Sequence, residues 1–411
     1  MDLRYLFIDF DSFFASVEQH WQPALRGRPV GIVPSLGTET TCCIAASYEA
    51  KRRGVKTGTG VREARFLCPD IVFVEGNHRR YVETHHAMIE TIEQCLHVEK
   101  VNSIDECYGQ LPPHWQAPDI ALAKCDEIKA ALAEKIGPNI TCSIGVGPNR
   151  FLAKLASKMR KPNGCQFITR ADLPGILYAF ELEDITGIGR SMRKRLDRHG
   201  IRSVRELCAA SAPQLARIWG SIHGQSMYRE LRGEDLPEVA TAHRTLSHSH
   251  ILPPVLRRTE RALPVMHKQL QKACRRLRAM DYYAGGMTIS VKFSFAWRWE
   301  RDVKVFPTQD TQTFTAHLNR LWADAPREDT PTQVRVVLWD LIPAATHTPS
   351  LFPDDNHPRR VALQKAMDSL TQRYGNASVY FAPAHEAHQR CAAPMRISFT
   401  HIPDITQEND G

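Results

Sequence analysis

Apolar and polar positions in the first part of the chain predict alternating strands and helices. The apolar stretch 5–8 has the pattern of a buried strand. The same unit is expected to continue with helices at 81–95 and 119–135 and with strands around 98–104, 107–111 and 139–146. Residues 11–77 interrupt it as a small insert with its own helix and strand, at 13–20 and 30–33. The pattern therefore predicts a discontinuous α/β unit made of residues 1–10 and 78–168.

The pattern changes from residue 184 onward. Short helices joined by glycine-containing turns are expected as far as residue 233, and the polar stretch 234–243 then has the composition of a linker. Beyond the linker, the pattern predicts a strand at 246–251, a basic helix at 261–279, strands at 287–295 and 303–306, a helix at 312–322 and a strand at 333–341. This β-α-β-β-α-β order indicates a second compact α+β domain. A helix at 361–374 and an acidic end at 405–411 are expected in the tail.

Composition limits the class of protein. A chain of 411 residues is expected to form two to four domains, and 43% hydrophobic with 24% charged residues is ordinary for a soluble protein. No apolar run approaches the roughly 20 residues of a membrane span, and no basic leader begins the chain, so a cytoplasmic protein without a membrane partner is expected. The 11 cysteines form no CxxC pair and are interpreted as reduced core residues. A net charge of +8 mildly favours polyanionic partners.

Carboxylates occur in two pairs that could serve a metal site. Asp9 and Asp11 follow the first apolar strand, and Asp105 is followed directly by Glu106. A two-metal site needs several carboxylates that converge from different strands, with ions roughly 3.5–4 Å apart. The alternative interpretation is that each pair is a solvated charge at the end of a strand.

Cations and a tyrosine follow in two further segments. The segment 46–56 carries Tyr48 and Lys51, and Lys161 ends a basic helix at 149–160 before a proline and a glycine. A bound triphosphate needs cations of this kind, because Mg²⁺ alone leaves phosphate charge uncompensated. The alternatives are an exposed basic helix face and an ordinary helix C-cap.

Two regions have the composition of a DNA-binding surface. Gly187 and Gly189, before the basic helix 192–199, are typical of a helix-hairpin-helix whose backbone N–H groups approach a DNA phosphate. A second such turn at 219–224 is less convincing, and a glycine-rich turn without a ligand is the alternative for both. The helix 261–279 and the residues before it concentrate cations that could grip duplex phosphates, namely Arg257, Arg258, Lys268, Lys272, Arg275, Arg276 and Arg278.

Four motifs in one order carry a resemblance to a known family. They are Ile8-Asp9-Phe10-Asp11-Ser12-Phe13-Phe14, Ser47-Tyr48-Glu49-Ala50, Ser103-Ile104-Asp105-Glu106 and Lys161-Pro162-Asn163-Gly164. In this order and spacing they closely resemble the Y-family translesion DNA polymerases, over about residues 1–345. Any one motif is weak, but four in register are highly specific.

The resemblance implies an α+β, multidomain right-hand polymerase. Its parts would be a palm, fingers, a helical thumb with the helix-hairpin-helix, a linker, a βαββαβ little finger that binds DNA, and a tail. Their expected bounds are 1–10 with 78–168, 11–77, 169–236, 237–244, 245–345 and 346–411, in that order.

The resemblance also implies a reaction and its metal ligands. Asp9, Asp105 and Glu106 would be the catalytic residues and would ligate two Mg²⁺ ions, with the backbone carbonyl of Phe10 as a further ligand. The primer 3′-hydroxyl would attack the α-phosphate of a template-selected deoxynucleotide, and pyrophosphate would leave. The expected function is low-fidelity synthesis in DNA damage tolerance.

Five residues would contact the incoming nucleotide. Phe14 matches the aromatic steric gate of the family, a ring that stands where a ribose 2′-hydroxyl would have to fit. Two core aromatics at a helix start are the alternative interpretation of Phe13 and Phe14. Lys51 stands where many members have arginine, which keeps the charge without the bidentate fork. The full expected set is Phe13, Phe14, Tyr48, Lys51 and Lys161.

The tail resembles a partner-binding segment. Thr348-Pro349-Ser350-Leu351-Phe352 is similar to the short peptide by which bacterial polymerases dock on the sliding clamp, with Leu351 and Phe352 as its apolar anchors. A local staple of the loop is the alternative. The partners implied are primer-template DNA, dNTPs, the sliding clamp and other SOS mutagenesis proteins, in the cytoplasm and associated with the nucleoid.

Two other classes of function are compatible with parts of the sequence. A catalytically weak or inactive clamp-tethered accessory protein of translesion synthesis would keep the fold and lose the metal carboxylates, and all three are present. A palm-fold nucleotidyl cyclase would share the strand-end aspartates. The hairpin at 184–189 and the basic second domain argue against it.

Overall fold

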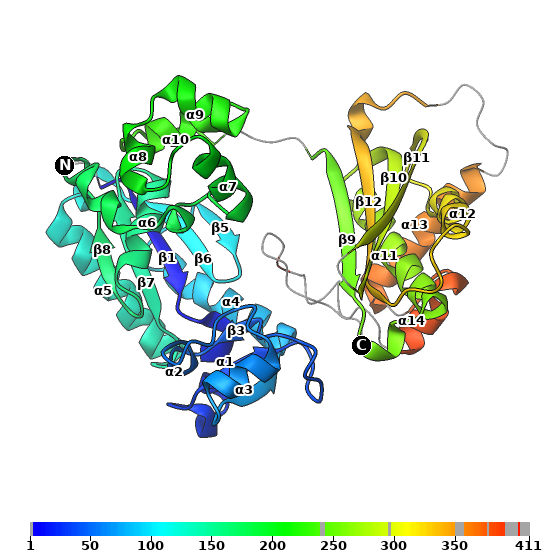
Figure 1. The fold of residues 1–411 in the computed structure, drawn as a ribbon, viewed down its shortest axis with the longest axis horizontal. Helices are drawn as coiled ribbons and strands as arrows, with labels where there is room; N and C mark the ends of the chain where they lie inside the picture. The colour runs from blue at the N-terminus through cyan, green and yellow to red at the C-terminus, as the bar shows by residue number, and fades with distance from the viewer. Residues whose placement is uncertain are drawn as a thin grey trace. The chain divides into compact units, whose positions relative to one another are not determined.

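The computed structural model describes residues 3–238, 243–294, 297–349, 357–375 and 378–390, together with residue 402. The chain separates into two compact units, and the boundary falls between Glu238 and Val239. Figure 1 shows a sheet with covering helices in each unit. Leu351 and Phe352 of the candidate clamp peptide lie outside the described residues.

A five-stranded sheet is the centre of the first unit. Its central strand β1 (Tyr5–Phe10) is buried along its whole length and runs antiparallel to both of its neighbours. The strand order is β5-β6-β1-β7-β8, in which the other strands are β5 (Lys100–Ser103), β6 (Glu106–Gln110), β7 (Cys142–Gly147) and β8 (Cys165–Phe167). The predicted alternation of strands and helices is confirmed, although β8 was not predicted and several ends differ by a few residues.

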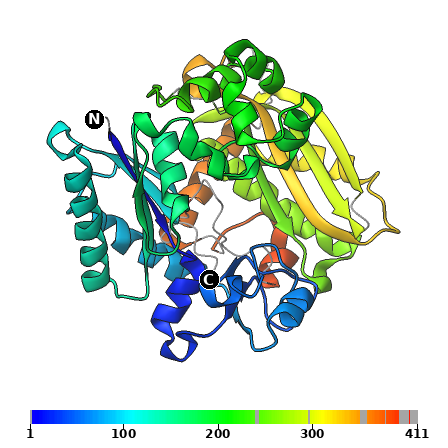
Figure 2. The same ribbon diagram turned by 60° about the vertical axis from the view of Figure 1, so that its left-hand side comes forward.

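Helices cover both faces of this sheet (Figure 2). On one face, α6 (Arg150–Met159) lies directly on β7, because a Cβ atom at Gly145 would be 2.0 Å from the Ala153 carbonyl oxygen. On the other face, α4 (His78–Glu93) packs against α5 (Pro118–Lys135), which also contacts β7 and β8. Alternate side chains of β1, among them Tyr5 and Phe7, therefore extend toward α6.

The insert contains more structure than its sequence pattern predicts. A three-stranded sheet of order β3-β2-β4 joins β2 (Val30–Val33), β3 (Ala45–Ala46) and β4 (Val72–Glu75), with helices α1 (Phe13–Trp21), α2 (Tyr48–Lys51) and α3 (Val61–Leu67) around it. Helix α1 and strand β2 were predicted. Strand β3 has two residues and α2 has four, too few to show a periodic pattern.

Short helices around one apolar core complete the first unit. They are α7 (Arg190–Arg198), α8 (Val204–Ala209), α9 (Ala212–Trp219) and α10 (His223–Glu230). Gly187 has φ +91°, a left-handed conformation that favours glycine. A Cβ atom at Gly224 would lie 2.3 Å from the Leu215 carbonyl oxygen, so this glycine serves the close packing of α9 against α10.

The second unit has the predicted β-α-β-β-α-β order. Helices α11 (Thr259–Ala279) and α12 (Thr311–Trp322) pack on one face of an antiparallel sheet and form its apolar core. The strand order is β11-β10-β12-β9, with β9 at Thr245–Ile251, β10 at Tyr282–Phe293, β11 at Arg298–Thr308 and β12 at Pro331–Pro343.

The tail packs back on helix α11 of this unit. Asp368 on α13 (His357–Tyr374) accepts two hydrogen bonds from the guanidinium of Arg278, at 2.6 and 2.8 Å. Gln271 exchanges two hydrogen bonds with the backbone of Phe381, which precedes α14 (His385–Gln389). Helix α11 therefore lies between its sheet and the tail. Among the described helices, none has both the length and the apolar character needed to cross a bilayer.

The close approach of α6 to β7 yields a stability prediction. Gly145→Ala should destabilise the protein by about 3 kcal/mol, because the new methyl group would overlap backbone atoms of Ala153 and Ser157 that cannot turn aside. Gly175→Ala is the control, since a Cβ atom added there would have no other atom within 4 Å. Urea unfolding followed by circular dichroism measures both variants. Equal stability of the two would contradict the packing described.

Candidate active site

The pairing of β1 with β6 places two of the predicted metal ligands side by side. Asp9 lies directly opposite Glu106 in this antiparallel ladder. Residues in such a pair extend from the same face of a sheet, and two like charges there repel one another. Positive charge is therefore expected at this point.

The turn between β5 and β6 brings the third carboxylate to the same place. The Asp105 carbonyl oxygen accepts a hydrogen bond from the backbone N–H of Phe10 at 2.8 Å. The hydroxyl of Ser103 donates to the Asp105 carboxylate at 2.5 Å. Asp105 is thus fixed beside the end of β1, next to Asp9.

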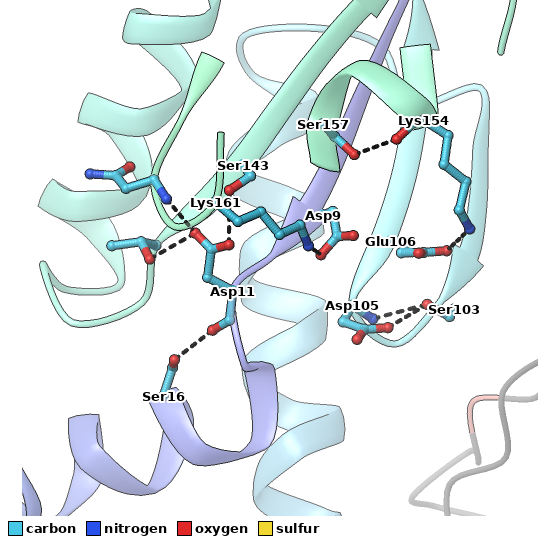
Figure 3. Close-up of polar contacts among 12 residues, drawn as sticks. Asp9, Asp11, Ser16, Ser103, Asp105, Glu106, Ser143, Lys154, Ser157 and Lys161 are labelled. Carbon is cyan, nitrogen blue, oxygen red and sulfur yellow. Dashed lines mark hydrogen bonds and ion pairs between the residues drawn. The ribbon is translucent and has the colours of Figure 1, made fainter. Parts of the chain in front are cut away.

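Two lysines from the α6 side supply the positive charge. Lys154 on α6 holds its Nζ 2.7 Å from Glu106 Oε2, and Lys161, just beyond the helix, forms an ion pair with Asp9. Figure 3 shows the two lysines ending at two different carboxylates. All four side chains are at most 27% exposed, so solvent screens these ion pairs less than surface pairs.

The pKa values of two carboxylates in this cluster are raised, because burial disfavours their charged forms. Burial raises the pKa of Asp9 to about 6; the Lys161 ammonium opposes this rise, and the Glu106 and Asp105 charges add to it. Burial also raises the pKa of Asp105, against the hydrogen bond from Ser103. Carboxylates with raised pKa values cluster at functional sites, where a bound cation or a proton transfer needs them.

The donor atoms fit a hard divalent cation. In the described parts of the chain, no three His, Cys, Asp or Glu side chains come close enough to share one metal ion. Even so, carboxylate and carbonyl oxygens are the ligands that Mg²⁺ prefers. Burial is the main cause of the raised pKa of Asp9, and a bound cation would stabilise its ionised form.

Asp11 has a different environment from Asp9 although the two are near neighbours in the sequence. It is 1% exposed, and its carboxylate points toward Ser143, away from Asp9 (Figure 3). Both oxygens already accept hydrogen bonds within the protein. Asp11 is therefore a buried, fully hydrogen-bonded carboxylate rather than part of the charged cluster.

The residues predicted to contact a triphosphate gather beside this cluster. Tyr48 and Lys51 lie on α2, with Lys51 Nζ 4.6 Å from the centre of the Tyr48 ring. Burial lowers the pKa of Lys51, and the positive charge of Lys161 lowers it further. The two lysines, from the insert and from the end of α6, are thus close enough to interact.

The two adjacent phenylalanines have different surroundings. Phe14 is partly exposed, and its ring stacks on that of Tyr81 with centroids 4.4 Å apart. Phe13 is 3% exposed and packs against the rings of Phe10 and Tyr81. The buried ring of Phe13 agrees with the alternative interpretation of a core aromatic, and its contact with a nucleotide stays a prediction.

The candidate DNA-binding residues also differ in their accessibility. Gly189 begins α7 with open space around its Cα, and Gly187 shapes the turn before it. Arg275 lines a hollow between α11 and the tail helices, and Arg276 is half-buried. Arg275 therefore faces the tail as well as solvent, and its contact with DNA phosphates stays a prediction.

Three family models match the chain in succession. The model of the impB/mucB/samB family matches residues 8–158. The DNA polymerase-iota thumb domain matches residues 183–235, and the impB/mucB/samB family C-terminal domain matches residues 243–351.

Relatives and a solved structure extend this likeness to most of the chain. DNA polymerase IV of Moorella thermoacetica is 31% identical over 93% of this chain and 96% of its own length. DNA polymerase IV 1 of Bacillus subtilis is 30% identical over 71% of this chain and 70% of its own length. A Y-family DNA polymerase chimera of Dbh and Dpo4 matches 83% of this chain and 100% of its own, with a TM-score of 0.69 at 23% identity. The chain belongs to the Y-family DNA polymerases.

This Y-family member is a DNA-directed DNA polymerase of the translesion type. Its substrates are DNA and deoxynucleotides, and Y-family polymerases depend on divalent metal ions. The alternative of an inactive accessory protein is not favoured, because the relatives are named as polymerases and the three carboxylates gather at one end of the central sheet.

Sequence reasoning did not assign the organising roles of three residues in this polymerase site. Lys154 lies in the basic helix before the Lys161 motif, and no sequence signal indicated that its ammonium reaches Glu106. Ser103 precedes Asp105 by two residues, which is typical of a local side-chain hydrogen bond. Asp11 left no signal beyond its charge in an apolar segment, because its partners come from distant parts of the sequence.

The raised pKa of Asp9 predicts a pH-dependent effect on stability. Between its ordinary value of 3.8 and about 6, Asp9 is ionised in the unfolded chain but protonated in the folded one. Its contribution to folding therefore becomes less favourable as pH rises through this window, by at most about 3 kcal/mol. Asp9→Asn removes this penalty and should stabilise the protein at pH 7 but not near pH 4, in buffer without divalent ions.

A second aspartate provides a control of opposite sign. A hydrogen bond from the Thr169 hydroxyl lowers the pKa of Asp172, so its stabilisation is present at neutral pH and lost as pH falls. Asp172→Asn should therefore destabilise the protein at pH 7. Urea unfolding at several pH values measures both variants against the wild type, and a pH-independent difference for Asp9→Asn would contradict the assignment.

Proposed function

We propose that this polymerase extends a primer at the cluster formed by Asp9, Asp105 and Glu106, which would hold two Mg²⁺ ions. The observation that carries the proposal is the register of β1 with β6, which puts Asp9 opposite Glu106 while the adjoining turn adds Asp105. The Phe10 carbonyl, at the end of the same strand, would be a further ligand. When bound, the ions would activate the primer 3′-hydroxyl and stabilise the leaving oxygen.

Cations around the cluster would bind the triphosphate of the incoming nucleotide. The flexible side chain of Lys161 reaches Asp9 in the free protein. A phosphate oxygen would offer the Lys161 ammonium an alternative acceptor. Lys51 and Tyr48 approach from the insert. The single O–H of Tyr48 donates to Asp11 in the free protein and would turn to a phosphate oxygen when the nucleotide binds. Because burial already lowers the pKa of Lys51, a nearby phosphate anion would stabilise its charged form.

Phe14 would select the sugar of this nucleotide. Its stacking on Tyr81 holds the ring in one place at the start of α1, directly after β1 and the metal ligands. A ring fixed in this way excludes a 2′-hydroxyl by overlap rather than by attraction to deoxyribose. Phe13 supports it from the core.

The arrangement of domains proposed is that of a right hand. The five-stranded sheet would be the palm, the insert the fingers, the short helices the thumb, and the second unit the little finger. The strand register of the second unit puts four cations on the side of the sheet opposite the apolar core, namely Lys292, Arg298, Lys304 and Arg335. Glu300 and Asp302 lie on the same side, so cations outnumber carboxylates among these six residues. This face would contact DNA phosphates independently of sequence.

Other contacts complete the proposed DNA path and the partners. The N–H groups near Gly187 and Gly189 would bind a phosphate, and a role of Arg275 and Arg276 in DNA binding stays a prediction. Leu351 and Phe352 would dock on the sliding clamp, and action with other SOS mutagenesis proteins at the nucleoid would follow from a role in damage tolerance.

Removing a carboxylate tests the metal site. Asp105→Ala or Glu106→Ala should reduce primer extension by at least about a thousandfold while duplex binding survives, because the carboxylates hold ions rather than DNA. Asp119→Ala, at an exposed position of α5 in the same unit, is the matched control. Extension by the double variant at a near wild-type rate would refute the assignment.

Truncating the two phenylalanines separately tests the sugar gate. Phe14→Ala should raise ribonucleotide incorporation relative to deoxynucleotide by on the order of tenfold to a hundredfold, because the 2′-hydroxyl gains space. Phe13→Ala should instead destabilise the fold by about 3–5 kcal/mol and leave sugar preference unchanged. Thermal stability and the rNTP/dNTP ratio are measured for both. A less stable Phe14→Ala variant with unchanged discrimination would contradict the gate.

A further inference from the structure

A single buried carboxylate connects three parts of the first unit. Asp11 directly follows β1 and is 1% exposed. Its Oδ1 accepts hydrogen bonds from the hydroxyls of Ser143 at 2.8 Å and Tyr48 at 3.3 Å. Its Oδ2 accepts from the hydroxyl of Thr141 at 3.0 Å and from the backbone N–H of Asn163 at 2.7 Å.

These four donors saturate the carboxylate. An ionised carboxylate offers about four lone-pair sites, and each oxygen of Asp11 accepts two hydrogen bonds. No lone pair is left for a metal ion, and the side chain points away from Asp9 (Figure 3). Asp11 therefore has a role that differs from that of the charged cluster.

Two of the donors belong to segments that carry the proposed triphosphate ligands. Tyr48 is itself one of these ligands and lies on α2 of the insert. Asn163 follows Lys161 by two residues and has φ +55°, so the loop turns sharply at this point. The same loop is held from its other side by Lys129, whose ammonium donates to the Asn163 carbonyl at 2.7 Å.

The loop has little freedom to adopt another shape. A Cβ atom at Gly164 would lie 1.7 Å from the Arg160 carbonyl oxygen, so the chain folds back closely on the end of α6. With the Asn163 N–H bound to Asp11 and its carbonyl bound to Lys129, both backbone polar groups of that residue are fixed. The starting point of the Lys161 side chain is fixed with them.

We propose that Asp11 is the positioning residue of the nucleotide site: in the free protein it holds the loop that carries Lys161 and the side chain of Tyr48 at the places where these two residues meet the triphosphate. The proposal rests on the function proposed above for these two residues. Asp11 touches neither the substrate nor the reacting atoms. It anchors the insert and the loop after α6 to one point at the end of β1, so the two groups of phosphate ligands keep a constant separation.

Replacing Asp11 tests the proposal through the affinity for nucleotide. Asp11→Ala leaves the Asn163 N–H without its acceptor and should raise the KM for dNTP by about a hundredfold, with a smaller effect on kcat. Asp11→Asn can still accept from Asn163 while the Ser143 and Tyr48 hydroxyls turn to become acceptors, so about tenfold is expected. Nucleotide affinity is also measured without chemistry, on a dideoxy-terminated primer.

A matched control separates positioning from stability. Asp310 is 3% exposed, caps α12 of the second unit and accepts hydrogen bonds from Gln312 and Thr313. Asp310→Asn makes the same chemical change at an equally buried carboxylate, and it should lower the melting temperature without changing the KM for dNTP. If Asp11→Asn lowers stability as Asp310→Asn does and leaves nucleotide affinity unchanged, Asp11 is merely structural and the proposal fails.

A variant cycle distinguishes failure of this proposal from failure of the nucleotide site itself. Tyr48→Phe removes the phenol hydroxyl, and its effect on dNTP affinity should be less than additive with that of Asp11→Asn, because both break the same contact. Fully additive effects would overturn the connection through Tyr48. If Lys161→Ala and Tyr48→Phe leave dNTP affinity unchanged, the assignment of the triphosphate site is refuted, and the role of Asp11 is refuted with it. Should Asp11→Ala not fold, Thr141→Val removes one donor and is expected to raise the KM slightly.

Discussion

Negative charge buried at the end of one strand is the constraint on which the site depends. Strand β1 is apolar and buried up to Asp9, and the register with β6 adds a second carboxylate directly opposite. In the free protein two lysines offset this charge from the α6 side. Glycines in β7 let α6 approach the sheet closely, and Lys154 on the helix and Lys161 just beyond it reach the carboxylates. Strand β1, helix α6 and the turn between β5 and β6 thus meet at the three carboxylates.

The elements with a long or strong pattern could be predicted from the sequence, and those without it could not. The buried run of β1, the long helices α4, α5 and α11, and the alternation in β10 agree with the predictions within a few residues at their ends. The two-residue strand β3 and the four-residue helix α2 depend on tertiary contacts that no local pattern records. The covering of α11 by the tail was missed for the same reason, since its contacts join residues about ninety positions apart.

The site was predictable where chemistry is concentrated in short motifs and unpredictable where partners converge from far along the chain. Asp9, Asp105 and Glu106 follow from their motifs, and the sheet register brings them together. The motif matched Phe14 to the steric gate, and the structure adds that the Phe13 ring is buried while Phe14 is partly exposed. The four partners of Asp11 come from three separate segments, and only the fold shows that they meet.

Because the tail packs on α11, the second unit extends beyond its last strand, β12, and includes the tail. The side chain of Arg278 is 15% exposed and takes its negative partner from the tail, while the Gln309 carbonyl, the Thr311 hydroxyl and the Gln364 side chain accept its other hydrogen bonds. A chain cut after β12 would leave this cation half-buried with no carboxylate beside it. The sheet, its helices and the tail therefore form one structural unit that should be transferred whole. A graft of the second unit into another polymerase would have to include the tail.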